Sequence, residues 1–120
     1  MTEQEASDLL EREHADVSEQ LEAIRSELDA TRQSTSAGTG DSDQFSDDTG
    51  LMVEQERLES LLASAEAHLE EVGAAQERVV AGTYGTCERC GKTITKERLK
   101  ALPSTRYCVG CATVVQRAAS

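Results

Sequence analysis

The residues best suited to chemistry are four cysteines near the C-terminal end of the chain. They form two C-x-x-C pairs, Cys87 with Cys90 and Cys108 with Cys111, and they are all the cysteines present. Residues 91–107 separate the pairs, which is a spacing typical of a structural zinc site. Zinc takes a tetrahedral shell of thiolates at about 2.3 Å, and each C-x-x-C turn can offer two of them. The sequence therefore predicts that the four cysteines hold one Zn²⁺ ion.

Other uses of the cysteines fit less well. Two disulfides would suit a secreted protein, but residues 1–5 do not begin a basic segment followed by an apolar run, as a secretory signal would. A thioredoxin-like redox pair would be a single C-x-x-C beside a βαβ pattern. A catalytic zinc usually has three protein ligands and a water, whereas four cysteines close the shell. No phosphate loop, nucleophile elbow or H-E-x-x-H motif is present, so no enzymatic activity is expected.

Turns must position these thiols. Gly91 and Gly110 stand at the two cysteine pairs, where we expect the positive φ that glycine adopts at little cost. Lys92–Ile94 reads as a short strand, Thr95 can cap a helix over 96–101 that Pro103 ends, and a last helix is expected from Cys111. The apolar residues available for a core here are few: Ile94, Leu99, Leu102, Tyr107, Val109 and Val114. Folding of this part should therefore depend on the metal.

The composition limits what the rest of the chain can do. The 120 residues include one Phe, two Tyr and no Trp, so a large globular core is not expected. Metal binding and helix pairing remain as ways to hold the chain together. No apolar run approaches the roughly 20 residues needed to span a bilayer. With no targeting segment visible, the expected location is the cytoplasm.

The net charge of −11 is unevenly divided. Residues 1–86 carry 21 acidic and 5 basic side chains, or −16, whereas residues 87–120 carry 2 and 7, or +5. Four thiolates and one zinc ion would add about −2 to the second part and leave it positive. The long acidic part should be repelled by nucleic acid and attracted to basic protein surfaces or channels, in a salt-dependent way.

Two helical segments with matching seams are predicted in the acidic part. The first runs from about Thr2 to Arg32, with Thr2 and Glu5 placed to form a capping box. Its apolar positions follow a heptad pattern if two polar residues complete the seam: Leu10, His14, Val17, Leu21, Ile24, Leu28 and Thr31.

The second helix is expected to begin between Ser46 and Gly50 and to end at Gly82, a suitable C-cap. Its seam has the same spacing: Leu51, Gln55, Leu58, Leu62, Ala65, Leu69, Val72, Gln76 and Val79. Between the helices, residues 33–50 are rich in Ser, Gly and Asp and are predicted to form an acidic tip loop. The two seams can bury each other as an antiparallel hairpin within one chain, which makes the protein a monomer, or they can pair between chains in a dimer.

These observations predict a mainly α fold. A two-helix antiparallel coiled-coil hairpin, residues 1–81 with its tip loop at 33–50, is followed by a small four-cysteine (C4) zinc-finger module, residues 82–120, with a short C-terminal helix. His14 and His68 have no acid or thiol placed to make them metal ligands and are read as packing or surface residues.

A family resemblance is specific over residues 82–111 and weaker over the preceding coiled coil, which has the same order of parts. The run Gly82-Thr83-Tyr84-Gly85-x-Cys87-x-x-Cys90-Gly91-x-x-Ile94, then Arg98-Leu99-x-Ala101-x-Pro103 and Cys108-x-x-Cys111, resembles the C4 zinc finger of the DksA/TraR family. The resemblance implies a bacterial transcription regulator that binds RNA polymerase rather than specific DNA sequences. It also implies that the coiled-coil tip enters the polymerase secondary channel, where acidic tip residues act on initiation.

The resemblance also assigns candidate residues. Counting back from Cys87, the family's D-x-x-D tip pair falls on Gln44 and Asp47, and a shift of one residue brings in Asp43. The tip group is therefore taken as Asp43, Asp47 and Asp48, against the simpler reading that these are solubilising turn and cap residues. The positions at which longer members contact the alarmone guanosine tetraphosphate are Glu71, Leu102 and Ala112 here, so weak or absent alarmone binding is expected.

A second function stays open on the residues alone. The zinc module could be a nucleic-acid or protein-binding module without polymerase activity, using a basic face made of Arg89, Lys92, Lys96, Arg98, Lys100 and Arg106. Few aromatic residues are available for stacking on bases, and the acidic arm would repel a phosphate backbone, which disfavours nucleic acid as the partner.

Overall fold

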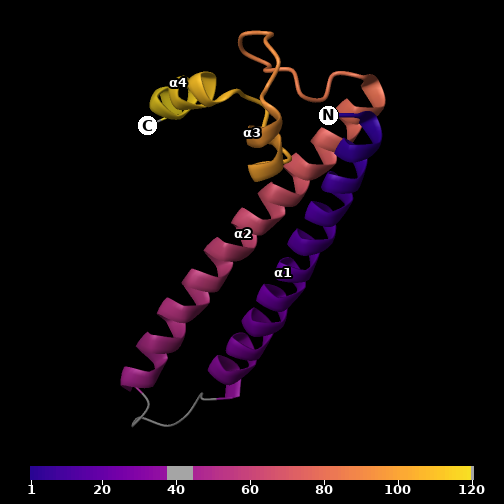
Figure 1. The fold of residues 1–120 in the computed structure, drawn as a ribbon. Coiled ribbons are helices and arrows are strands. Elements are labelled where there is room, and N and C mark those ends of the chain that lie inside the picture. Colours follow the sequence, from indigo (N-terminus) through magenta and orange to yellow (C-terminus); the bar gives the residue numbers. More distant parts are fainter. Residues whose placement is uncertain (38–44, 120) are drawn as a thin grey trace. The chain divides into compact units, whose positions relative to one another are not determined.

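The computed structural model describes residues 1–37 and 45–119, with side chains described for 1–34 and 50–118. Its helices are α1 (Glu3–Ala37), α2 (Phe45–Ala81), α3 (Lys96–Ala101) and α4 (Val109–Ala119). Long α1 and α2 form a helical hairpin, and the two short helices follow it in the chain (Figure 1). The extended structure found in the described part is one antiparallel bridge between Thr86 and Thr93. The predicted mainly α fold is confirmed.

By contacts, the chain divides into two compact units. One comprises Met1–Ala15 and Leu69–Ser120, and the other Asp16–His68. The first unit therefore contains the four cysteines together with the ends of both long helices. The predicted boundary after residue 81 separates a hairpin from a zinc finger by type of structure, and it stays a prediction.

In the unit of Asp16–His68, α1 and α2 bury a common seam. Val17, Leu21 and Leu28 from α1 are buried, as are Leu58 and Ala65 from α2. Because these residues repeat at heptad spacing, the same face of each helix turns toward its partner. Ion pairs between the helices flank the seam: Arg25 with Glu66 at 3.7 Å and Arg32 with Glu59 at 3.3 Å. The pairing of the two seams within one chain is thus observed.

In the unit of Met1–Ala15 and Leu69–Ser120, the same two helices form a second buried cluster. Ala6, Leu10, Val72, Ala75 and Val79 are buried together, and Tyr84 packs against them. Small residues such as alanine allow two helix backbones to approach closely. The predicted seam did not include Ala6 or Ala75.

His14, which was predicted to complete the seam of α1, is exposed. An imidazole has two polar ring nitrogens, and burying them without hydrogen-bond partners costs free energy.

The helix ends differ from the prediction around the connection. Helix α1 continues to Ala37 instead of ending at residue 32, and α2 begins at Phe45 rather than between 46 and 50. Residues 33–37 contain no Gly or Pro to stop α1, and Gly50 is tolerated inside α2 at a cost of about 1 kcal/mol. Asp47 and Asp48 fall in the first turn of α2, where the helix dipole favours acidic residues. The predicted tip loop, residues 33–50, is therefore too long; residues 38–44 lie outside the described part.

The start of α1 and the end of α2 are capped at the predicted residues, Thr2 and Gly82. The Glu5 amide donates to Thr2 Oγ1 at 3.1 Å at the start of α1. After α2, Gly82 has φ +78°, and the amides of Thr83 and Tyr84 donate to the Arg78 carbonyl at 2.9 and 3.2 Å. This left-handed residue turns the chain out of α2 and toward the cysteines. No helix in the described ranges has the length and apolar character required to cross a lipid bilayer.

Candidate metal centre

The first cysteine pair lies in a tight turn. The Gly91 amide donates to the Cys87 carbonyl at 2.9 Å, and the Cys87 amide donates to the Lys92 carbonyl at 2.8 Å. Gly91 has φ +75°, a value that favours glycine, as predicted. The predicted strand at 92–94 is reduced to the single bridge between Thr86 and Thr93, because the chain turns at once to enter α3. The turn presents both thiols of the pair on one side.

The second pair is held by the start of α4. Cys108 directly precedes the helix, and the Ala112 amide donates to its carbonyl at 2.8 Å. Helix α4 begins at Val109 and not at Cys111 as predicted, so Cys111 lies in the first turn. Gly110 is therefore helical and does not take the expected positive φ. The helical turn itself supplies the spacing of this pair, and no glycine is needed.

The four sulfur atoms converge. The Sγ atoms of Cys87, Cys90, Cys108 and Cys111 all lie within 4.8 Å of one another, and the Cys90 and Cys108 sulfurs are 3.9 Å apart. Tetrahedral bonds of about 2.3 Å place sulfurs about 3.8 Å apart. All four cysteines are free thiols, with Cys87 and Cys111 buried and Cys90 exposed. The donor set fits one structural zinc ion with a closed shell.

The electrostatics of the cluster also call for a cation. Burial alone would raise the pKa of Cys87. Hydrogen bonds from the backbone N–H groups of Cys108, Cys90 and Arg89 outweigh burial and lower this pKa to about 6. The backbone N–H of Cys111 lowers the pKa of Cys108. The Arg89 guanidinium would lower the pKa of Cys111, yet the neighbouring Cys108 thiol and burial outweigh it and raise that pKa to about 11. Several thiolates this close repel one another, and a divalent cation removes that repulsion.

A small core supports the metal turns. Ile94 and Leu99 are buried with Cys87 and Cys111, and Tyr84 and Tyr107 pack against them. Thr95 caps α3 by accepting a hydrogen bond from the Arg98 amide at 3.3 Å, as predicted. Three residues expected in this core are instead exposed: Leu102 at 49%, Val109 at 62% and Val114 at 43%. With α4 starting two residues earlier, only Cys111 of its first turn is buried against this core.

Most of the predicted basic face is engaged inside the molecule. Lys96 pairs with Glu5 at 3.4 Å, and Arg106 pairs with Glu71 at 2.7 Å. Arg98 donates to the Tyr107 carbonyl at 3.3 Å, and Arg89 Nη1 lies 3.7 Å from the Cys111 sulfur. Lys92 and Lys100 are exposed. The face is therefore not a continuous platform of available cations.

The positions considered for the alarmone offer it little. Glu71 is an anion that already pairs with Arg106, and hydrogen bonding from Arg106 lowers the pKa of Glu71, so it stays ionised at neutral pH. Leu102 is half-exposed and apolar, and Ala112 is half-buried. A polyphosphate would meet a carboxylate and two apolar side chains at these three positions.

For the predicted tip residues Asp43, Asp47 and Asp48, the structure describes no side chains. Asp43 lies outside the described residues. The backbone places Asp47 and Asp48 in the first turn of α2, and their side chains lie outside the described part. Their role as a tip group stays a prediction.

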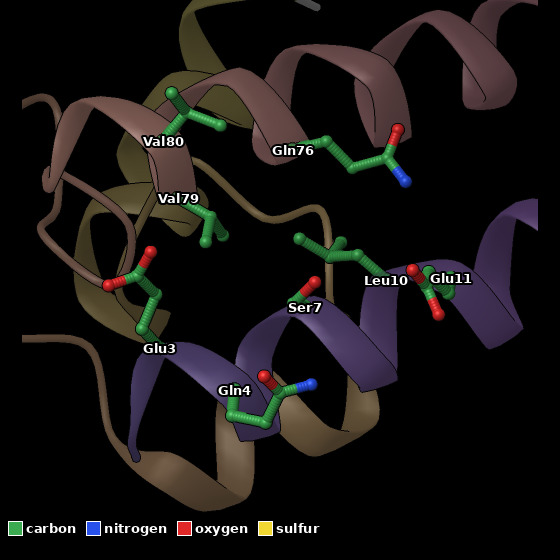
Figure 2. Close-up of a pocket in the computed structure, with 8 residues that line it drawn as sticks. All are labelled: Glu3, Gln4, Ser7, Leu10, Glu11, Gln76, Val79 and Val80. Carbon is green, nitrogen blue, oxygen red and sulfur yellow. The ribbon is translucent and has the colours of Figure 1, made fainter.

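A groove lies between the start of α1 and the end of α2. Its volume is about 540 Å³, and Figure 2 shows that its lining residues come from both helices: Glu3, Gln4, Ser7, Leu10, Glu11, Gln76, Val79 and Val80. The lining holds no cysteine or histidine, so it adds no soft metal ligand to those found above. The four-thiol cluster is the centre around which the chemistry of the described residues is organised.

The helical hairpin and the closed four-thiol centre define a small α-helical protein organised by a structural zinc ion. Residues 82–117 match the family model described as the prokaryotic DksA/TraR C4-type zinc finger. This part of the chain therefore carries the DksA/TraR C4-type zinc finger that its motifs predicted.

Similar proteins extend the comparison. An uncharacterized protein of Aquifex aeolicus (strain VF5) is 47% identical over 72 residues, covering 59% of this chain and 50% of the relative. General stress protein 16O of Bacillus subtilis (strain 168) is 28% identical over 95 residues, covering 78% and 58%. The chain thus matches half to three-fifths of the length of these curated relatives.

A solved structure shares the fold. The transcription factor DksA2 from Pseudomonas aeruginosa superposes with a TM-score of 0.77, covering 96% of this chain and 83% of that one. At 21% sequence identity, this likeness shows the fold alone.

Proposed function

We propose that the protein is a bacterial transcription regulator that binds RNA polymerase and acts on initiation through the tip of its helical hairpin, inserted in the secondary channel. The observation that carries the proposal is the joining of a DksA/TraR-type zinc finger to a hairpin of the same fold as a known transcription factor. In this proposal the protein works in the cytoplasm by binding, as a monomer, and catalyses no reaction of its own.

The charge of the chain supports a protein partner. Residues 1–86 carry a net −16, and the ion pairs described along the hairpin use only part of those carboxylates. An acidic hairpin is attracted by a channel lined with basic groups, and its association should slow as salt rises. Asp43, Asp47 and Asp48 are the proposed acting group at the tip.

A binding and transcription assay with purified core polymerase tests the proposal. The variant D43N/D47N/D48N removes three carboxylates at the tip, and E19Q/E56Q/E70Q removes three exposed ones elsewhere on the hairpin. We expect both variants to be retained by polymerase, and only the tip variant to lose its effect on initiation. If the tip variant changes transcription as much as the unmodified protein does, the tip assignment is wrong. If the unmodified protein does not bind polymerase, the function is wrong.

The alternative is that the zinc module binds nucleic acid or another protein without acting on polymerase. Four of the six cations of the predicted basic face already contact partners within the molecule, which weakens the nucleic-acid form of this alternative. Fluorescence anisotropy with a labelled DNA duplex at low salt measures it directly. Submicromolar, salt-sensitive binding by the zinc-loaded protein would favour the alternative.

Alarmone dependence is a separate matter. Because Glu71 is ionised and paired, we propose that guanosine tetraphosphate binds this chain weakly or not at all. Titration calorimetry with the alarmone should show no saturable heat. A micromolar dissociation constant would refute this part of the proposal.

A further inference from the structure

Arg106 makes the densest set of polar contacts around the metal centre. It lies two residues before the zinc ligand Cys108. Its guanidinium contacts Glu71 of α2 through two bonds, Nε–Oε2 at 2.7 Å and Nη2–Oε1 at 3.2 Å. The remaining nitrogen, Nη1, lies 3.0 and 3.3 Å from the two carboxylate oxygens of Glu88. One side chain thus joins two carboxylates that lie on different elements.

One of those carboxylates belongs to the other cysteine turn. Glu88 lies between the ligands Cys87 and Cys90, and its backbone N–H donates to the Arg106 carbonyl at 2.9 Å. The two residues are therefore joined by both backbone and side chain. This double link ties the first cysteine turn to the segment of chain that leads into the second.

The other carboxylate connects the centre to α2, and a second arginine repeats the connection. Arg78 follows Glu71 by seven residues, or about two helical turns, and so lies on the same face of α2. Arg78 Nη2 donates to the carbonyls of Ser104 and Thr105 at 3.3 and 3.5 Å, and Nη1 lies 4.0 Å from Glu88. The Arg78 side chain is 13% exposed, so water competes little for these contacts. One face of α2 therefore contacts both the first cysteine turn and the segment that leads to the second.

We propose that Arg106 is a positioning residue that couples zinc retention to the last turns of α2. When zinc holds both cysteine turns, Glu88 and Arg106 stand where Glu71 can bind the guanidinium. When the ion leaves, the turn that carries Glu88 is released and the contact with α2 weakens. Because such a linkage is reciprocal, weakening the α2 contact must also weaken zinc binding.

Groups beyond the metal ligands commonly change metal affinity by 10- to 100-fold when removed. A competition assay against a chromogenic chelator measures that affinity in the full chain. We expect R106Q to bind zinc about tenfold more weakly, and R106K to recover part of the loss because it keeps the charge but not the two-pronged contact.

The decisive variant is E71Q, because Glu71 lies on α2 and outside both cysteine turns. We expect E71Q to weaken zinc binding by up to about fivefold, the factor that corresponds to a partly exposed ion pair. The matched control is E5Q, which breaks the single contact of 3.4 Å between α1 and Lys96. E5Q should leave zinc affinity within about twofold. Unchanged zinc affinity in E71Q, or an equal loss in E5Q, would overturn the proposal.

Amide hydrogen exchange over residues 69–81 provides the reciprocal readout, with and without zinc. In the unmodified protein, zinc removal should speed exchange in these turns. In zinc-loaded R106Q exchange should already be faster, and zinc removal should add less than it does in the unmodified protein. If the effects of zinc removal and of R106Q simply multiply, or if zinc removal leaves residues 69–81 unchanged, the coupling does not exist.

Discussion

Removal of zinc should unfold the module that follows α2 while the hairpin of Asp16–His68 stays folded. In the core around the metal turns, the side chains buried beside the cysteines are those of Ile94 and Leu99. Burial of an isoleucine or leucine stabilises a fold by about 1.5–3 kcal/mol, so this pair contributes about 3–6 kcal/mol. A structural zinc ion contributes about 10–16 kcal/mol at neutral pH. The ion thus stabilises the module more than its apolar core does.

The effect can be measured by circular dichroism and by NMR. Helices α3 and α4 have 6 and 11 residues, against 35 and 37 in α1 and α2. Loss of the two short helices should therefore remove about a fifth of the helical signal when a strong chelator is added. In the NMR spectrum, the amides of residues 95–102 should move to random-coil positions, and those of Asp16–His68 should keep their dispersion.

The control is to restore the metal. Added zinc should recover the lost signal, and added magnesium should not, because thiolates bind magnesium poorly. If the amides of α3 remain dispersed and protected in the zinc-free protein, Ile94 and Leu99 suffice to fold the module. The argument that metal and folding are coupled would then fail.

Three further predictions concern the helices. Leu10→Ala should lower the free energy of unfolding by about 2–5 kcal/mol, because Leu10 is fully buried, and urea unfolding measures the change. Gly82→Ala should lower the free energy of unfolding by about 1–2 kcal/mol, because Gly82 has φ +78°. Gly73→Ala should raise it by about 0.5–1 kcal/mol, because Gly73 lies inside α2 with open space around it. Equal effects of the two substitutions would contradict the assigned backbone. Hydrogen bonding from Gln55 lowers the pKa of Glu59 from its ordinary value of 4.5. The ionised carboxylate therefore stabilises the hairpin at pH values above 4.5, and this contribution is lost as the pH falls through the lowered pKa. Gln55→Ala should raise the pKa of Glu59 in a carboxyl NMR titration, and an unchanged pKa would exclude the hydrogen bond as its cause.

The features of this protein that could be predicted are those that depend on residues close together in the sequence. The spacing of the cysteines, the cap at Thr95 and the glycine at 82 each follow from a few neighbouring residues. The leucine and valine seam follows from a repeat that every turn of the helix reinforces. These patterns depend little on distant segments, which is why the structure confirms them.

The parts that could not be predicted depend on packing between distant segments. Ala6 and Ala75 are buried in the cluster that α1 and α2 share, and residue type alone does not separate a buried alanine from an exposed one. Val109 and Val114 are apolar but exposed, because the position of α4 and not hydrophobicity alone decides their burial. The hydrogen-bonded ion pair between Arg106 and Glu71 joins residues 35 apart in the sequence, so no local sequence pattern could predict it.

That bond changes the meaning of the uneven charge. Taken from the sequence, seven basic residues after position 86 suggest a face for an anionic partner. In the structure, Arg106 and Lys96 instead hold carboxylates of α2 and α1, so part of the positive charge serves to attach the zinc module to the ends of the helices. A nucleic-acid partner would have to compete with these contacts for its cations. The acidic side chains of residues 1–86 outnumber the basic ones, so most of them cannot be neutralised within this part, which is what the proposed binding to a basic channel requires.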